Sequence, residues 1–494
     1  MYKRQLIDVE LSKSEQKKKA KAQKALQQKI DQQKGYIQDI QDNQIYHDAL
    51  EWRFEFPEVL DDEGEYVGFD MVVGNPPYFS LTTIPEMAPY YSNGDYLTYM
   101  KGTDIYCLFY EKGAQLLTRD GVLTYITSNS WIRAKYGHEL KQFFLASCDI
   151  LSLINIEDVQ IFEEATVESN ILTLSNSHSD GTMDVAILDS AYSITESLHD
   201  YVSQESFRVS ISTDQPWLLE RPYVIALMSK IETDSVSLGS MSVNINRGFL
   251  TGYNDAFIID EATKESLIDS DEKNAELIKP ILRGRDLSKY FYSFNKNWVI
   301  ATFPSLELEI SDYPFVESYL LTYGQERLAQ IGGKGSRKKT KHKWYETQDT
   351  IAYWREFLEP KIVWGEISDR AKFAFDDEGY FPEATAFFMT GEKLKYLLGI
   401  LNSKLSEWYF RLIGTTTGMG TNRWKKYKIE LLPIKLASRA EEQALEDKVD
   451  KIITIKKQDP AADTSLLESE IDQMVYELYG LTEEEIEIIE KAIG

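Results

Sequence analysis

The residues whose chemistry stands out are Asn75, Pro76, Pro77 and Tyr78, which directly follow the apolar run Phe69 to Val73. Asn75 offers a side-chain carbonyl, Pro76 a backbone carbonyl and Tyr78 a flat ring. Two hydrogen-bond acceptors beside an aromatic platform suit the exocyclic amine of a nucleic-acid base. They can draw the amino nitrogen toward a tetrahedral geometry without a strong base. Tyr78 would stack on a base that has been rotated out of its duplex.

A strand has to deliver these groups to the edge of a sheet. The run Phe69 to Val73 is typical of a strand buried on both faces in a parallel sheet. Pro76 has no N–H and cannot continue the hydrogen-bond ladder. We therefore expect Asn75 to Tyr78 on a loop at the carboxyl edge of the sheet, where open α/β sheets bind ligands. The structural alternative is a plain proline turn after a strand.

The residues downstream alternate between helical and strand patterns. A helix is predicted to open at Thr103, followed by a strand at 122–127, a helix at 132–146 and a strand at 151–156. Together with the first strand this gives a β-α-β-α-β order, which is half of a doubly wound sheet. The sequence therefore predicts an α/β fold around the Asn75 loop.

At these residues the sequence resembles the gamma-class N6-adenine DNA methyltransferases, and more closely the type IIG restriction-modification enzymes. The tetrapeptide alone also occurs in protein-glutamine and ribosomal-RNA guanine methyltransferases. The resemblance implies that Asn75, Pro76, Pro77 and Tyr78 are catalytic and that a flipped adenine is methylated on N6. It also implies that Phe162 faces this adenine from the side opposite Tyr78. The alternative for Phe162 is a hydrophobic plug before a strand.

The cofactor implied by the resemblance is S-adenosyl-L-methionine. Phe56 and Pro57 lie in a box that resembles the Trp-x-x-x-Phe-Pro-Glu box of type IIG enzymes, and they either border the cofactor's adenine or pack in the core. The family's Gly-rich loop, Phe-x-Gly-x-Gly, is missing before Asn75 and after it. We therefore expect an incomplete cofactor site. The chain would be a fragment, a split subunit whose companion or N-terminal half carries the loop, or a DNA-recognition protein without catalysis.

A long mixed region follows from about residue 206. The boxes at 244–254 and 278–287 resemble the opening of TaqI-type target-recognition domains, which implies double-stranded DNA as the partner. The basic run from 332 to 344 is expected to be a mobile loop that becomes ordered on DNA. The expected DNA-binding residues are Arg247, Thr251, Lys334, Arg337, Lys338, Lys339, Lys341, Lys343, Arg423, Lys425 and Lys426.

Charge supports this division of the chain. The 494 residues carry a net charge of −26, yet residues 236–435 hold 28 Lys+Arg against 27 Asp+Glu. Local rather than total charge governs contact with phosphate, so this middle segment is where DNA is expected to bind. The tail after it is acidic, with capping-box spacing and an apolar stripe that predict helices packed on the preceding domain.

The expected organisation is a helical arm over 1–50, the C-terminal part of a methyltransferase domain over 51–205, a target-recognition domain over 206–435 and a helical tail over 436–494. The fold class is thus α/β, with a partial Rossmann-like methyltransferase sheet followed by an α+β domain. Cys107 and Cys148 and five scattered histidines lack metal-ligand spacing, so no metal site is expected and both thiols should lie in the core. No apolar run approaches the ~18 residues of a membrane span, and a cytoplasmic protein is expected. No nuclease motif is recognisable.

Overall fold

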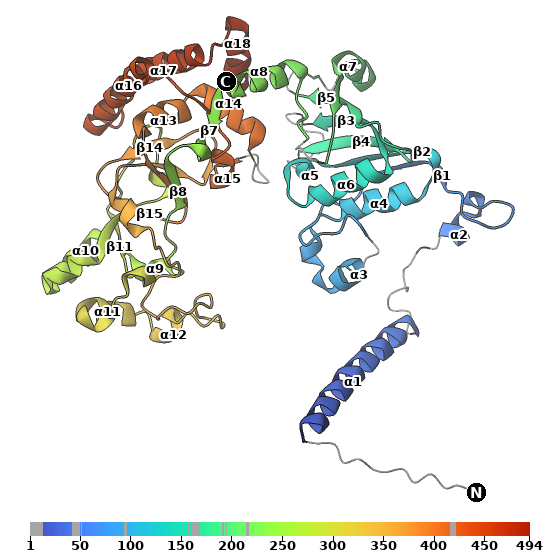
Figure 1. Ribbon diagram of the computed structural model, residues 1–494, viewed down its shortest axis with the longest axis horizontal. Coiled ribbons are helices and arrows are strands. Elements are labelled where there is room, and N and C mark those ends of the chain that lie inside the picture. The colour runs from blue at the N-terminus through green and yellow to red at the C-terminus, as the bar shows by residue number, and fades with distance from the viewer. Residues whose placement is uncertain are drawn as a thin grey trace.

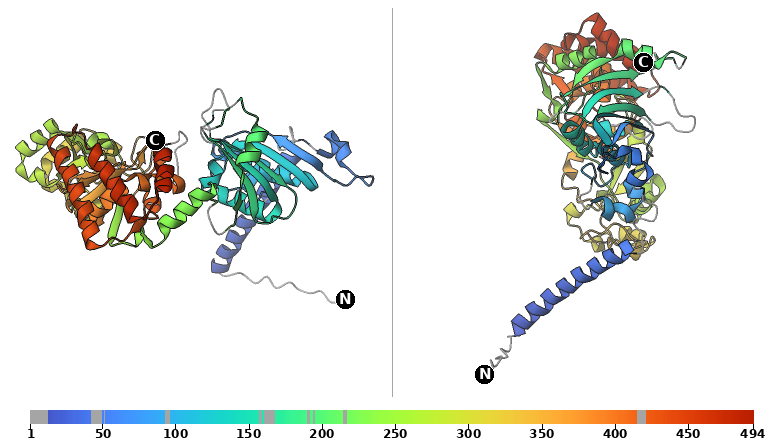
Figure 2. Two further views of the ribbon diagram at one scale, coloured as in Figure 1. Left: turned by 90° about the horizontal axis from the view of Figure 1, so that it is seen from above. Right: turned by 90° about the vertical axis from the view of Figure 1, so that its right-hand side faces the viewer.

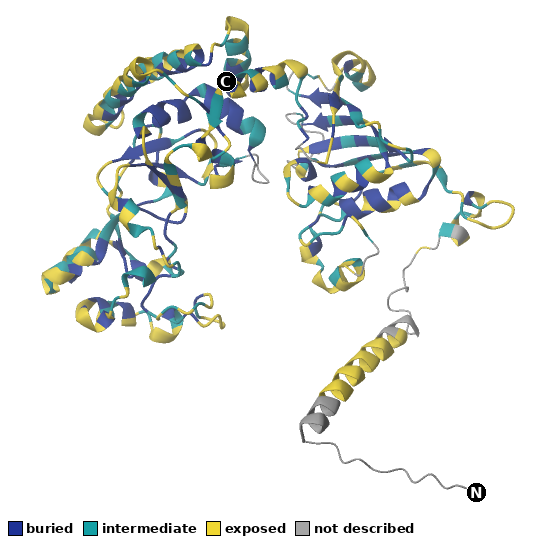
Figure 3. Ribbon diagram, viewed as in Figure 1, coloured by how far each residue is buried: buried dark blue, intermediate teal, exposed yellow. Residues whose placement is uncertain are grey.

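The computed structural model describes residues 13–41, 50, 52–92, 96–156, 159, 168–189, 192–193, 195–213, 217–414 and 421–494. Two lobes are joined by helix α8 (Pro222–Glu232), and helix α1 (Lys13–Gln41) projects away from both (Figure 1). Figure 2 shows the same two lobes from above, again connected by α8. Helix α1 covers residues 13–41 of the arm that the sequence predicts over 1–50, and the side chains described there are exposed (Figure 3).

The first lobe is built on a six-stranded sheet with the strand order β1-β2-β4-β3-β5-β6. β1 runs parallel to β2 and β3 runs parallel to β5, whereas β4 and β6 are antiparallel to their neighbours. The strands are β1 (Phe69–Gly74), β2 (Leu117–Ser128), β3 (Asp149–Ile156), β4 (Ser169–Ser175), β5 (Thr182–Leu188) and β6 (Phe207–Ser210).

The predicted β-α-β-α-β order is confirmed. Helix α4 (Tyr106–Gln115) leads into β2, and helices α5 (Ser130–Arg133) and α6 (Gly137–Ser147) lead into β3. α4 and α6 lie on one face of the sheet in Figure 1, and both cysteines are buried and unpaired. The smaller helices of this lobe are α2 (Trp52–Glu55), α3 (Ala88–Ser92) and α7 (Leu198–Glu205).

The burial expected for β1 is wrong. Val72 packs against the core of the lobe, but Met71 and Val73 are 65% and 68% exposed. The reason is that β1 is the edge strand of the sheet and pairs with β2 alone. Among the described residues before β1, the chain forms helices, a turn and one bridge between Leu60 and Tyr66, and no strand of this sheet.

The boundary between the lobes lies later than expected. β6 belongs to the first sheet, and Trp217 and Leu219 are buried in the core of the first lobe. Val224 and Leu227, on α8, are buried in the core of the second lobe. The change of domain therefore falls between Leu219 and Val224 rather than after residue 205.

The second lobe contains two four-stranded sheets in the orders β15-β10-β11-β9 and β14-β12-β16-β8, which confirms the α+β expectation. Their strands are β8 (Val243–Arg247), β9 (Ile258–Asp260), β10 (Ile278–Leu282), β11 (Asn297–Ile300), β12 (Lys361–Gly365), β14 (Phe373–Asp376), β15 (Phe381–Pro382) and β16 (Ala386–Gly391). Two-stranded ladders join β13 (Ile367–Ser368) to β17 (Asn422–Arg423) and β7 (Ser235–Ser237) to β18 (Pro433–Lys435). The helices are α9 (Asn254–Phe257), α10 (Glu261–Ser270), α11 (Pro314–Leu321), α12 (Gln325–Leu328), α13 (Leu394–Leu401), α14 (Lys404–Ile413) and α15 (Lys426–Ile429).

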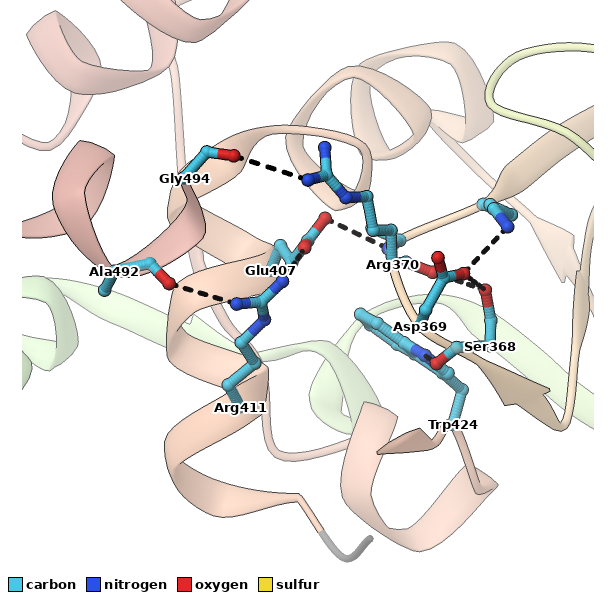
Figure 4. A network of polar contacts seen from close by, with 10 residues as sticks. Ser368, Asp369, Arg370, Glu407, Arg411, Trp424, Ala492 and Gly494 are labelled. Carbon is cyan, nitrogen blue, oxygen red and sulfur yellow. Dashed lines mark hydrogen bonds and ion pairs between the residues drawn. The ribbon is translucent and has the colours of Figure 1, made fainter. Parts of the chain in front are cut away.

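The acidic tail forms helices α16 (Arg439–Gln458), α17 (Ser465–Leu478) and α18 (Glu483–Ile493), which pack on the second lobe as expected. Arg411 donates a hydrogen bond of 3.0 Å to the carbonyl of Ala492, and Arg370 donates one of 3.4 Å to that of Gly494 (Figure 4). Cations at the carboxyl end of a helix satisfy carbonyls that have no partner within the helix. These contacts fasten α18 to α14 and to the segment after β13.

No helix in the described part of the chain is long and apolar enough to cross a membrane. Within those same residues, no group of three or more His, Cys, Asp or Glu side chains could hold a metal ion.

Candidate active site and DNA interface

The Asn75 loop lies where the sequence predicted it. β1 ends at Gly74, so Asn75 stands at the carboxyl edge of the parallel pair β1 and β2. The Asn75 side chain is exposed and has no hydrogen-bond partner among the described residues, whereas Pro76 is buried and Pro77 is exposed. An exposed amide beside a buried proline is therefore presented from the end of a paired strand.

Tyr78 is held at both ends of its side chain. Its hydroxyl donates a 2.9 Å hydrogen bond to the carbonyl of Ile126 on β2. Its ring meets Tyr106 edge-to-face, with 6.2 Å between the ring centroids and 88° between the planes. Burial raises the pKa of Tyr78 to about 12, so the hydroxyl stays protonated at neutral pH. The backbone just after it is fixed because the carbonyl of Phe79 accepts a hydrogen bond from Ile105 N–H.

A buried polar contact supports the ring against which Tyr78 packs. The Tyr136 hydroxyl donates to a carboxylate oxygen of Asp104 at 2.7 Å and lies 2.8 Å from the hydroxyl of Tyr106. Tyr106 is fully buried, and burial raises the pKa of its phenol well above the ordinary range. Sequence reasoning missed this arrangement, because Tyr136 lies on the far side of β2 in the sequence and only packing brings it to Asp104.

Further polar side chains line the same edge of the sheet. Asn170, on β4, donates a 3.0 Å hydrogen bond to the carbonyl of Ser128, and Asn129 donates to the side-chain oxygen of Asn155 at 3.2 Å. The side-chain oxygen of Asn170 is buried and accepts no hydrogen bond from any residue that the structure describes. Phe162, the expected second aromatic of the base pocket, lies outside the described residues.

Phe56 and Pro57 lie at the other end of β1. Phe56 stacks on Trp52 at 5.6 Å and meets Phe69 edge-to-face at 5.4 Å, while Pro57 is exposed. Phe69 opens the six-residue strand β1, so this cluster is separated from Asn75 by about 20 Å of strand. The three rings pack on one another and each is only partly buried, so both alternatives for Phe56 and Pro57, a border of the cofactor's adenine and core packing, stay predictions.

Within the basic run from 332 to 344, the structure corrects the prediction that Arg337 binds DNA. Arg337 is 2% exposed and donates to the carbonyls of Leu328, Thr251 and Trp344 at 2.6 to 2.7 Å. These bonds hold Arg337 inside the folded loop, so Arg337 is not available to phosphate. Thr251 is also fully buried and its hydroxyl lies 2.5 Å from the Asn254 side chain, which removes it from the DNA contacts.

The other lysines of this loop point outward. Lys343 is half-exposed but pairs with Glu309 at 2.8 Å, and this contact raises the pKa of Lys343. The remaining lysines of the run, Lys334, Lys338, Lys339 and Lys341, are exposed. They form the part of the predicted phosphate-binding run that the structure leaves accessible.

Three of the other expected DNA-binding residues converge on one carboxylate. Arg247 lies 3.4 Å from Glu366, Arg423 lies 3.9 Å from it and Lys425 lies 3.8 Å from it. Lys426 is turned away from this carboxylate, since it donates to the carbonyl of Ile245 at 2.8 Å and pairs with Glu430. The sequence predicted these cations individually but gave no sign that Glu366 joins them.

Two families of known proteins match this chain. The Eco57I restriction-modification methylase family matches residues 4–162, and the TaqI-like C-terminal specificity domain matches residues 279–434. The first match contains the Asn75 loop and strands β1, β2 and β3 of its six-stranded sheet, and the second contains Glu366, Arg423, Lys425 and the basic loop, whereas Arg247 lies before it. The two matches divide the chain as the two lobes do.

Three known type II methyltransferases are similar to most of this chain. The chain is 22% identical over 475 residues to the type II methyltransferase M.BstVI of Geobacillus stearothermophilus, and the aligned region covers 91% of this chain and 79% of the relative. It is 24% identical over 435 residues to the type II methyltransferase M.PaeR7I of Pseudomonas aeruginosa, and the aligned region covers 84% of this chain and 71% of that relative. It is also 24% identical over 444 residues to the type II methyltransferase M.XhoI of Xanthomonas vasicola, and the aligned region covers 85% of this chain and 76% of that relative.

A solved structure shows the same fold. The type IIL restriction-modification enzyme MmeI in complex with DNA superposes with a TM-score of 0.54 at 14% sequence identity, covering 90% of this chain and 58% of that one. The chain thus spans under two thirds of that longer enzyme. The chain therefore contains a region that matches the Eco57I restriction-modification methylase family, followed by a region that matches the TaqI-like specificity domain, and over most of its length it is similar to type II methyltransferases.

Proposed function

We propose that this chain holds the target base and reads DNA in a site-specific adenine-N6 methyltransferase. The observation that carries the proposal is an exposed Asn75 amide at the end of β1, next to the firmly held ring of Tyr78. The lone pair of adenine's amino nitrogen is delocalised into the base. Asn75 Oδ1 and the Pro76 carbonyl would each accept one N–H of that amine and favour the tetrahedral nitrogen that the reaction requires.

The base has to leave the duplex to reach these acceptors. The Tyr78 ring is a suitable stacking surface because its hydroxyl bond to Ile126 and its contact with Tyr106 fix it before the base arrives. Phe162 would close the pocket from the opposite side. A pre-ordered platform saves the entropy of ordering a side chain during binding.

The test is to measure modified nucleosides in DNA from cells that carry the gene, with Asn75→Ala introduced in place. We expect N6-methyladenine to fall by about two orders of magnitude or more, the usual effect of removing one preorganised partner of the reacting group. Gln443→Ala, an exposed amide on α16, serves as the matched control and should leave it unchanged. Unchanged N6-methyladenine, or methylation found on cytosine instead, would overturn the proposal.

The methyl-donor side of the site is not supplied by the described residues. The relatives are methyltransferases, which implies S-adenosyl-L-methionine as the donor. However, β1 ends the sheet on the side where further strands would stand, and the chain has no Gly-rich turn of the family type. The residues present therefore fit the target base but not the donor.

We infer that a companion polypeptide or an N-terminal half supplies the donor side by adding a strand to β1. Every second residue of an edge strand leaves its N–H and C=O unpaired, and here Met71 and Val73 add exposed apolar side chains. The surrounding residues 50–74 carry eight acidic side chains and one basic one. The added strand should therefore be apolar and flanked by Lys or Arg.

A double substitution tests this inference. Met71→Lys with Val73→Lys should abolish N6-methyladenine in the same cells, while the purified variant keeps its DNA affinity and its unfolding midpoint. These side chains are already in water in the chain alone, so only the attachment of the partner should suffer. Full methylation by the double variant would contradict the inference.

The second candidate function is a DNA-recognition subunit without catalysis in a restriction-modification or defence system. The missing donor side is the observation that favours it. Under this alternative the chain still binds DNA, but Asn75→Ala has no effect on methylation anywhere in the genome.

A further inference from the structure

We propose that Arg247, Arg423 and Lys425 form one binding site for the DNA backbone phosphate, and that Glu366 is the positioning residue that holds these cations together. The proposal rests on the proposed function, which requires that the second lobe bind DNA. The present proposal names the side chains that bind the DNA backbone and assigns a positioning role to Glu366.

The cluster is assembled from separate parts of the chain. Arg247 ends β8, Arg423 ends β17 and Lys425 follows shortly after, while Glu366 lies between β12 and β13. Each cation lies within 3.4 to 3.9 Å of a Glu366 carboxylate oxygen. All three charged groups therefore sit within reach of a single phosphate.

The carboxylate is placed by a rigid scaffold. Glu366 N–H donates to the carbonyl of Thr385 at 2.9 Å, and its own carbonyl accepts from Trp424 N–H at 2.8 Å. Trp424 is buried, stacks on Phe410 with 3.9 Å between ring centroids, and donates from its indole to the carbonyl of Ser368 at 3.1 Å. Figure 4 shows Trp424 and Ser368 in this position, next to the helices of the tail. These contacts hold Trp424, which lies between Arg423 and Lys425 in the chain, in a fixed position.

The cations face solvent more than the carboxylate does. The side chains of Arg247, Arg423 and Lys425 are 50%, 39% and 34% exposed, and that of Glu366 is 19% exposed. One negative charge among three positive ones leaves a net charge of about +2 directed outward. A guanidinium offers several N–H donors that match phosphate oxygens. The Nε of Arg247 already donates to the carbonyl of Ala384 at 2.9 Å, which leaves its terminal nitrogens for phosphate.

The residues around the cluster favour the binding of a DNA backbone that continues past it, rather than the binding of a single isolated anion. Burial raises the pKa of Asp349, and the charges of Arg247 and Lys338 oppose this rise, so the cluster and the exposed basic loop act on the same carboxyl. On the other side, burial lowers the pKa of Lys428 on α15, and the charge of Arg133 on α5 lowers it further. Arg247 and Lys338 are thus near one another at Asp349, and a positive side chain of α15 lies near Arg133 of the first lobe.

Salt dependence of DNA binding tests the site. The binding of a fluorescent duplex of arbitrary sequence to the purified chain is measured over a range of salt concentrations. The triple variant Arg247→Ala, Arg423→Ala, Lys425→Ala should reduce the slope of log K against log salt by about one, because each phosphate contact contributes about 0.9. Lys425→Met alone should weaken binding at constant salt without disturbing the fold.

The matched control is Lys491→Ala, which removes an exposed lysine that also pairs with a glutamate, on α18. This control should leave both the affinity and the slope unchanged. A triple variant with an unaltered slope would overturn the phosphate site while leaving the proposed function intact. A wild-type chain that does not bind duplex DNA at all would overturn both.

The expected effect of Glu366→Gln on DNA affinity is opposite in direction to the effect that its change in charge alone would predict. Removing a negative charge about 5 Å from a phosphate should improve affinity a few-fold in water. Freeing three side chains that were ordered in advance should cost about two- to tenfold for each of them. We therefore expect Glu366→Gln to bind DNA several-fold more weakly than the wild type, and tighter binding would overturn the positioning role of Glu366.

Discussion

Tyr78 combines two properties that single substitutions can separate. Tyr78→Phe keeps the ring and its contact with Tyr106 but loses the hydroxyl bond to Ile126. Tyr78→Ala removes the stacking surface, which is worth about 1 to 3 kcal/mol for a base on an aromatic ring. We expect N6-methyladenine in cells to fall a few-fold in the first variant and about 10- to 100-fold in the second. Equal losses in both variants would contradict stacking as the main role.

At the residue scale, local motifs were predictable and inward-facing cations were not. Asn75 to Tyr78 could be placed because a strand, two prolines and a ring follow one another directly in the sequence. Arg337 was misread because composition cannot show which cation of a basic run turns inward to three carbonyls. Glu366 and Tyr136 were missed for a related reason, since their partners are brought near only by tertiary packing.

At the scale of elements, the order of helices and strands could be predicted but their neighbours in the sheet could not. The apolar pattern of β1 is the same whether a strand is central or at an edge, so the exposure of Met71 and Val73 was not foreseen. β4 enters the sheet between β2 and β3, although it follows both in sequence. Local patterns carry no information on such pairing, which is decided by packing across the sheet.

The basic loop provides a stability prediction. Arg337→Ala should lower the free energy of unfolding of the second lobe by about 3 kcal/mol or more, because it leaves buried carbonyls of Leu328, Thr251 and Trp344 without a donor. Lys338→Ala, an exposed neighbour, should change it by less than about 0.5 kcal/mol. Urea unfolding followed by circular dichroism measures both, and equal stabilities would show that Arg337 is not the anchor of the loop.

Helix α6 provides a prediction of pH dependence. Lys141 donates to the carbonyl of Ile132 and lies 5.6 Å from the ring centroid of Trp217. Burial lowers the pKa of Lys141 from 10.5 to about 8. Between these values the unfolded chain binds more protons than the folded one, so the stability of the first lobe should rise by about 2 kcal/mol from pH 8 to pH 10.

Lys141→Met isolates this contribution from other groups that titrate in the same range. The difference in unfolding free energy between wild type and variant should change by that amount over pH 8 to 10. A difference that stays constant across this range would show that Lys141 is not desolvated in the folded lobe.

At the scale of the whole molecule, the two lobes have separate cores and a short connection. Trp217 and Leu219 are buried in one core and Val224 in the other, and between them Arg221 forms a 3.0 Å ion pair with Asp189. The net charge of −26 arises outside residues 236–435, because 28 Lys and Arg balance 27 Asp and Glu within that segment. Under the proposed function the first lobe presents Asn75 and Tyr78 to a base, and in the described part of the chain no strand other than β2 pairs with β1.

We therefore propose that this chain holds the target base and the DNA, and that a polypeptide added at β1 holds the methyl donor. Calorimetric titration of S-adenosyl-L-methionine into the purified chain, with duplex DNA titrated into the same preparation, tests this assignment most directly. We predict that the DNA binds and that the donor gives no binding signal. Stoichiometric binding of S-adenosyl-L-methionine to the chain alone would contradict it and show that these residues complete the donor site themselves.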